Sequence, residues 1–216
     1  MKNSSIKLEM KELKYLMRYI EHNKGIRIFL NRLMKQNKIK SKEYTVIKAE
    51  KFKIKDLNIS FMVVGLKENQ VKLVLVKNKQ DYHVFGSIIE EENGKEIMKG
   101  YNLSNNHIQQ IVLKEYDEKF KQELKKLEES EKNYSEKEKI NKEGIPCIYG
   151  NWCGPGCSGP GAPISPVDAC CKAHDLCYGK KGYFCSTCDD ELVDCLAPYV
   201  VQGDKWAIII SKWFSR

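Results

Sequence analysis

The sequence predicts an α+β N-terminal region followed by a small, mainly α, disulfide-rich domain with two antiparallel helices. The composition breaks sharply, because all nine cysteines, all six prolines and all three tryptophans lie from Pro146 onward. Before that break, the hydrophobic pattern changes from helical spacing to short β-like runs and back again. We therefore expect an α+β domain over residues 1–127, a charged linker over 128–145 and the second domain over 146–216.

Two helices are expected near the N-terminus. Apolar residues at helical spacing mark the first at Leu13, Leu16, Met17 and Ile20, and the second at Phe29, Leu30, Leu33 and Met34. Such a spacing places the apolar side chains on one face of a helix.

Strands should follow. Short runs rich in β-branched and aromatic residues are broken by segments of Gly, Asn and Asp. The clearest runs are Tyr44–Ala49, Ile59–Val64, Val71–Val76 and Tyr82–Ile89. Antiparallel hairpins are the natural interpretation of this spacing.

A further helical stripe follows the strands, formed by Tyr116, Phe120, Leu124 and Leu127. The stripe is lost over Glu128–Glu143 while the charge continues, which is typical of a solvated helix end or linker. The histidines of this region, at 22, 83 and 107, are scattered and form no catalytic cluster. The residues before the composition break therefore indicate no activity, and a leader or pro-region is one interpretation of them.

The net charge of +8 favours approach to polyanions, either nucleic acid or an anionic lipid surface. The sequence lacks the signatures of nucleic-acid-binding motifs, so we expect no nucleic-acid partner. It also lacks an apolar run of the length that spans a bilayer or forms a secretory signal.

The cysteine-rich region predicts a helical hairpin. Pro166, with Asp168 as the expected cap, opens a helix over Ala169–Tyr178, and a second helix runs from about Cys185 to Ala197. Cysteines seven residues apart lie on one face of each helix. An antiparallel pair then places Cys170 opposite Cys195 and Cys177 opposite Cys188, at the separation that disulfides need.

Zinc is the alternative use of these cysteines, through Cys185, Cys188 and their neighbours. Four zinc ligands would leave five cysteines over, and zinc does not predict the matched spacing. The disulfide interpretation is therefore preferred.

The hairpin register also predicts a catalytic cluster. It brings Asp189 level with His174, on the first-helix face that carries Cys171, Asp175 and Tyr178. A histidine flanked by two carboxylates is an arrangement suited to general base catalysis.

Three segments resemble the phospholipase A2 family. Residues 168–178 match its active-site pattern DxCCxxHDxC, residues 152–156 match its calcium loop, and the segment from Cys188 to Leu196 matches its second long helix. The short core is similar to the phospholipase domains of bee-venom type and of parvovirus capsid proteins. The resemblance covers about 50 of the 216 residues.

The resemblance implies calcium-dependent hydrolysis of the sn-2 ester of glycerophospholipids. His174 would be the general base, Asp189 would orient it, and Tyr178 would support the pair. The implied calcium ligands are the Asp175 carboxylate and the carbonyl groups of Trp152, Gly154 and Gly156. The implied disulfides are Cys153–Cys171, Cys170–Cys195 and Cys177–Cys188.

The chain departs from the family pattern in several places. The long β-hairpin is missing, and the usual N-terminal interfacial helix is absent or replaced. The sequence does not assign partners to Cys147, Cys157 and Cys185. Because nine is odd, at least one thiol is free or forms an intermolecular disulfide. The tail Trp206–Arg216 has two open interpretations: a membrane contact or a final helix packed on the core.

The leading hypothesis is a phospholipase A2 that acts on a phospholipid membrane or vesicle surface with calcium as cofactor. The cysteines favour an extracellular or exported protein, although the N-terminus shows no classical signal peptide. A non-catalytic membrane-binding or antimicrobial toxin module, released from an N-terminal leader, is the alternative. An intracellular zinc-binding protein is a third.

Overall fold

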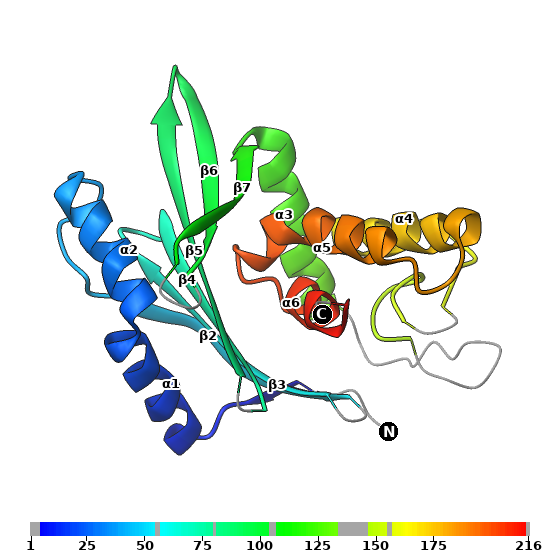
Figure 1. Cartoon of the computed structure of the whole chain (residues 1–216), viewed down its shortest axis with the longest axis horizontal. Helices are drawn as coiled ribbons and strands as arrows, with labels where there is room; N and C mark the ends of the chain where they lie inside the picture. The colour runs from blue at the N-terminus through cyan, green and yellow to red at the C-terminus, as the bar shows by residue number, and fades with distance from the viewer. Residues whose placement is uncertain are drawn as a thin grey trace. The chain divides into compact units, whose positions relative to one another are not determined.

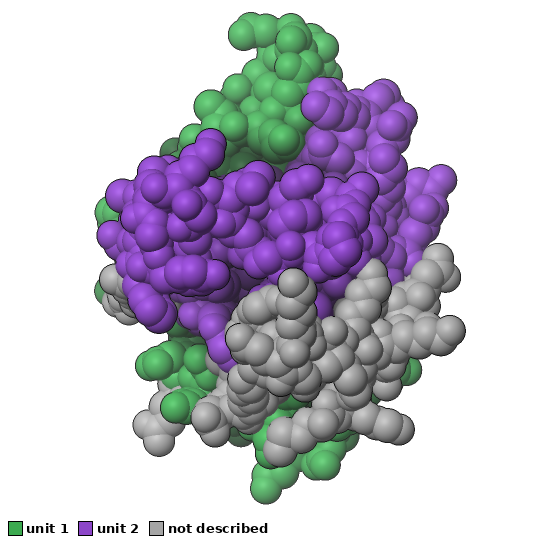
Figure 2. Space-filling view, turned by 90° about the vertical axis from the view of Figure 1, so that its right-hand side faces the viewer, with its two compact units in different colours: residues 1, 3–116, 201–203 green, residues 2, 117–200, 204–216 purple. Residues whose placement is uncertain are grey.

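The chain forms two compact units, coloured separately in Figure 2. The first holds Asn3–Tyr116 and Val201–Gly203, and the second holds Asp117–Val200 and Asp204–Arg216. The computed structural model describes residues 5–54, 57–79, 81–103, 107–133, 147–154 and 157–214.

The first unit contains a seven-stranded antiparallel sheet whose strands follow one another in sequence order (Figure 1). The strands are β1 (Ser5–Lys7), β2 (Thr45–Ile54), β3 (Leu57–Leu66), β4 (Val71–Asn78), β5 (Asp81–Glu92), β6 (Lys95–Asn102) and β7 (Gln109–Glu115). The four runs indicated by the sequence lie in β2 to β5, and β6 and β7 extend the sheet beyond them. From β2 to β6, each strand is separated from the next by two to four residues, as expected for antiparallel hairpins.

Helices α1 (Met10–His22) and α2 (Lys24–Lys35) lie along one face of this sheet (Figure 1). Their apolar stripes pack on alternate residues of the central strands, among them Met62, Leu73 and Leu75. Asn23 separates the helices, and its side chain accepts the Ile26 N–H at 2.9 Å, so it caps α2. The face of the sheet under α1 and α2 therefore forms one hydrophobic core.

The second unit contains four helices among its described residues: α3 (Glu118–Asn133), α4 (Pro166–Lys181), α5 (Ser186–Val200) and α6 (Lys205–Phe214). The predicted fold class is wrong on this point, since it gave the disulfide-rich domain two helices. Helices α4 and α5 are the predicted pair, and α3 and α6 are additional. None of the described helices is both long and apolar enough to cross a membrane.

Helix α3 packs on the disulfide-rich part through specific contacts. Its Phe120 ring lies 5.7 Å from the ring of Tyr199, and its Ser130 hydroxyl hydrogen-bonds the Tyr149 hydroxyl at 2.7 Å. The sequence predicted the apolar stripe of this helix, but periodicity alone does not reveal which part of the chain the stripe will contact.

The tail forms helix α6, which is packed on the core. This is the second of the two interpretations that the sequence left open. Trp206 and Ile208–Ile210 are buried, and the Trp206 ring stacks on that of Tyr149 at 4.8 Å. Burial of these large side chains stabilises the unit and removes most of the tail from contact with solvent.

Four disulfides hold the second unit together. Two of them join α4 to α5, Cys170–Cys195 and Cys177–Cys188, with Cα separations of 5.9 and 5.8 Å. The others are Cys153–Cys171 and Cys147–Cys157. Cys185 remains a thiol. With eight of nine cysteines in disulfides, too few thiols are left for the zinc site considered above.

Candidate active site

Helix α4 carries the central residues of the site, and its first turn is fixed by local chemistry. Ser165 is the N-cap, because its hydroxyl accepts the Asp168 N–H at 3.2 Å, and Pro166 follows in the first turn. The expectation that Asp168 would cap this helix is therefore wrong.

The Asp168 side chain organises the preceding loop instead. Its carboxylate is fully buried and accepts the backbone N–H groups of Asn151, Trp152 and Ile164 at 2.9–3.1 Å. Several N–H donors replace the hydrogen bonds to water that a carboxylate loses on burial. Asp168 thus anchors the glycine-containing loop to α4, together with the Cys153–Cys171 disulfide.

His174 and Asp189 meet across the helical hairpin. The His174 Nε2 lies 3.0 Å from Asp189 Oδ1, and both side chains are buried. The Tyr178 hydroxyl donates to the same Asp189 oxygen at 2.5 Å. The structure therefore brings together the three residues expected to form the base and its support.

This contact leaves the other ring nitrogen of His174 available. If the Nε2–H donates this hydrogen bond to the Asp189 carboxylate, Nδ1 is the ring nitrogen that can accept a proton. His174 and Asp175 both line a cavity of about 440 Å³. A histidine held in this way is arranged to act as a general base.

Asp175, the next residue on α4, is 3.9 Å from His174, measured from Oδ1 to Nδ1. Burial raises the pKa of its carboxyl to about 6, while a hydrogen bond from Ser158 and the nearby His174 act in the opposite direction. Its Oδ2 is buried and makes no hydrogen bond to any described group. A buried oxygen of this kind is suited to bind a cation.

The remaining predicted metal ligands come from the loop anchored by Asp168. Trp152 and Gly154 both line the cavity beside Asp175, and Gly154 has a φ of +139°. Gly156 lies outside the described residues. The described residues contain no cluster of three or more His, Cys, Asp or Glu side chains that could hold a metal. One carboxylate with backbone carbonyls is nonetheless a donor set that suits calcium, a hard cation with oxygen ligands.

The wall of the cavity includes residues that the sequence did not assign to the site. Ile210, Trp213 and Phe214 of α6 line it, and the Phe214 ring meets the His174 ring edge-on, with centroids 4.7 Å apart. The aromatic residues of the tail were noted, but no pattern in the sequence linked them to His174.

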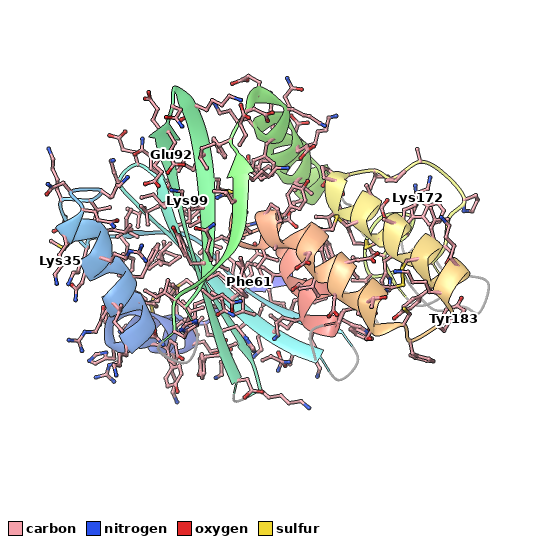
Figure 3. All side chains as sticks on the ribbon, turned by 45° about the horizontal axis from the view of Figure 1, so that its top comes forward. Lys35, Phe61, Glu92, Lys99, Lys172 and Tyr183 are labelled. Atoms are coloured by element: carbon pink, nitrogen blue, oxygen red, sulfur yellow. A yellow bond between two sulfur atoms is a disulfide. The ribbon has the colours of Figure 1, made fainter. Side chains whose placement is uncertain are left out.

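The loop between α4 and α5 contributes two exposed aromatic residues. Tyr183 and Phe184 line the same cavity and are 79% and 85% exposed. Figure 3 shows Tyr183 at the tip of the hairpin formed by α4 and α5. Exposed aromatic side chains beside an apolar cavity are typical of a surface that contacts a partner.

Comparison with known proteins gives matches to several proteins named phospholipase A2 homologs. The taipoxin gamma chain of Oxyuranus scutellatus scutellatus, named an acidic phospholipase A2 homolog, is 34% identical over 82 residues, covering 28% of this chain and 52% of that protein. Probable phospholipase A2 homolog 1 of Oryza sativa subsp. japonica is 36% identical over 59 residues, covering 26% and 43%.

Over about a quarter of its length, this chain is similar to proteins named for the phospholipase A2 family. Phospholipase A2 homolog 3 of Oryza sativa subsp. japonica, at 43% identity over 53 residues, covers 23% of this chain and 32% of that protein. The chain thus spans between a third and about half the length of these relatives. No family model and no solved structure matches it.

Proposed function

We propose that this protein is a calcium-dependent phospholipase A2, which hydrolyses the sn-2 ester of glycerophospholipids to a fatty acid and a lysophospholipid. The hydrogen bond between His174 and Asp189 at the cavity wall is the observation that carries the proposal. A scaffold that only binds membranes has no need of a buried histidine oriented by a buried carboxylate.

His174 accepts the proton of a water molecule through Nδ1 as that water attacks the ester carbonyl carbon. Asp189, bonded to Nε2, fixes the tautomer and stabilises the imidazolium that forms. Tyr178 holds the Asp189 carboxylate in place. His174 then returns the proton to the leaving alcohol, so the ring is regenerated.

Calcium is the proposed cofactor. The Asp175 carboxylate and the carbonyl groups of Trp152, Gly154 and Gly156 would hold it, and the unbonded Asp175 Oδ2 supports this role. When bound, the ion would polarise the ester carbonyl group and stabilise the negative charge that develops on its oxygen.

The proposed partner is a phospholipid membrane or vesicle surface. Tyr183 and Phe184 are positioned to enter the interfacial layer beside the cavity, and aromatic rings favour that layer. The four disulfides support an oxidising compartment, so we place the protein outside the cell or in an exported state.

The test is release of fatty acid from mixed phospholipid vesicles by oxidised protein, with calcium or with EGTA. Release of the sn-2 chain should require calcium and should be lost in His174→Gln. A folded protein that binds vesicles yet releases no fatty acid would contradict the enzyme and favour the alternative, a non-catalytic membrane-binding or toxin module.

A further inference from the structure

The net positive charge of this chain lies outside the phospholipase-like region. Of the 37 Lys and Arg residues, 23 lie in residues 1–116 together with 13 of the 29 Asp and Glu residues, a formal charge of +10. Residues 117–216 carry −2. Attraction of anions is therefore a property of the unit with the sheet, for which the catalytic proposal gives no role.

Part of this charge surrounds a groove of about 420 Å³ at α1. Lys11, Lys14 and Arg18 lie on the groove side of the helix, within two turns and about 10.5 Å of rise. The exposed ring of Tyr15 lies among them, and the buried side chain of Leu16 contributes an apolar wall. The groove thus combines a row of cations with apolar surface.

The sheet adds a fourth cation. Lys77 on β4 pairs with Ser60 on β3 and with Tyr82 on β5, and it continues the row of alternate residues that packs beneath the helices. Its Nζ lies 5.1 Å from the ring centroid of Tyr15 and 5.7 Å from that of Tyr82. The two rings hold the ammonium group in place, and its charge also helps to lower the pKa of the nearby Glu12 carboxyl.

The four cations of the groove are Lys11, Lys14, Arg18 and Lys77. None of them has an ion-pair partner among the residues that the structure describes. Glu12, the acidic residue of the groove, bonds to Lys51 at 2.9 Å, and this contact holds the pKa of its carboxyl below the usual value. Four cations against one engaged carboxylate leave a net positive groove. Cations gathered on the walls of one groove raise the local concentration of anions.

We propose that this groove binds a phosphate ester. The planar guanidinium of Arg18 can donate two parallel hydrogen bonds to phosphate oxygens, and Lys14 and Lys77 can add charge from either wall. Tyr15 offers a ring on which the organic part of the ester can pack. The ester is either the head group of an anionic phospholipid or a free phosphorylated molecule, since both present the same group. The site is independent of the catalytic proposal.

The experiment compares two triple variants of the full chain in EGTA, so that lipid is not consumed. Lys14→Gln/Arg18→Gln/Lys77→Gln removes two lysines and one arginine from the groove. Lys24→Gln/Arg27→Gln/Lys35→Gln removes the same charge from α2, and none of these three residues lines the groove. Sedimentation measures binding to phosphatidylcholine vesicles with or without phosphatidic acid, and calorimetry measures binding of inositol trisphosphate. A thermal melt checks that each variant is folded.

We expect the groove variant to bind at least about tenfold more weakly and the α2 variant to stay within about threefold of wild type. If the groove variant loses binding to vesicles alone, the ligand is a lipid head group. If it also loses binding to inositol trisphosphate, the ligand is a soluble ester. Equal weakening in both variants, or no binding of either probe by wild type, would overturn the site. If the groove variant is unfolded, Arg18→Gln alone must give the selective loss.

Discussion

Asp168 Oδ1 accepts the backbone N–H of Trp152 at 2.9 Å, so a buried residue in the first turn of α4 fixes the loop expected to hold calcium. The same carboxylate accepts two further backbone N–H groups, from Asn151 and Ile164. The geometry of the proposed metal site therefore depends on a residue that is not one of its proposed ligands.

Replacement of Asp168 by Asn should destabilise the protein by about 2–4 kcal/mol and weaken calcium binding. An amide offers a single acceptor oxygen and presents N–H donors to the backbone N–H groups. Urea denaturation and calcium titration measure the two effects. Asp190→Asn, which changes an exposed carboxylate in the same way, should have little effect on either. Equal stability of Asp168→Asn and wild type would contradict the anchoring role.

Neighbouring carboxylates on α5 provide a matched test of the catalytic pair. Asp189 is buried against His174, whereas Asp190 is exposed. Asp189→Asn should lower kcat by about 10²–10⁴, because the imidazolium loses its partner and the required tautomer is no longer favoured. Asp190→Asn should keep kcat within about twofold of wild type. Similar rates for the two variants would remove Asp189 from the mechanism.

The exposed pair Tyr183 and Phe184 should contribute to activity on vesicles but not to activity on dispersed substrate. In Tyr183→Ser/Phe184→Ser, activity on vesicles should fall about tenfold or more, because each ring contributes apolar area to interfacial binding. Hydrolysis of a short-chain phospholipid below its micelle concentration should change little. Leu113→Ser on β7, which removes another exposed apolar side chain, is the control. A parallel fall on both substrates would indicate damage to the cavity.

Cys185 should be the reactive thiol of the folded protein. It is partly exposed and lies 3.1 Å from the Thr187 hydroxyl, and this hydrogen bond lowers the pKa of the thiol. Iodoacetamide should label one site without prior reduction, and oxidation of concentrated protein should give a covalent dimer. Both signals should vanish in Cys185→Ser. Labelling at any other cysteine would contradict the disulfide pattern.

The sequence predicted the helical hairpin because its constraints are local. Cysteines seven residues apart on each helix admit a single antiparallel register, and that register also carried Asp189 to His174. The strands of the sheet could be predicted for a similar reason, since each run of β-branched and aromatic residues is contiguous in the sequence. The functional roles of the site residues remain predictions.

Contacts between distant segments could not be predicted in this way. The approach of Phe214 to His174 depends on how α6 folds back, which no periodicity encodes. The predicted number of helices in the disulfide-rich domain was wrong for the same reason. The apolar stripe of α3 does not indicate that this helix packs on Tyr199 of that domain. Asp168 was assigned to a helix cap because two of its N–H partners, Asn151 and Trp152, lie in a loop more than a dozen residues away.

The raised pKa of Asp175 predicts how pH affects the calcium-free protein. Burial raises the pKa of this carboxyl from 3.8 to about 6, so between these values the folded state binds more protons than the unfolded state. The free energy of unfolding should therefore fall as pH rises from about 4 through about 6, by on the order of 2 kcal/mol. Asp175→Asn should lack this part of the dependence, as measured by urea denaturation in EGTA.

Calcium should reverse which of wild type and Asp175→Asn is the more stable at neutral pH. Without the ion, Asp175→Asn should be the more stable, because wild type buries a charged carboxylate that makes few compensating contacts. With calcium, wild type should gain stability in proportion to its affinity and the variant should gain little. Since the ion competes with a proton for the same carboxylate, its affinity should rise with pH through about 6. If the stability of wild type changes with neither calcium nor pH in this range, Asp175 is excluded as a ligand.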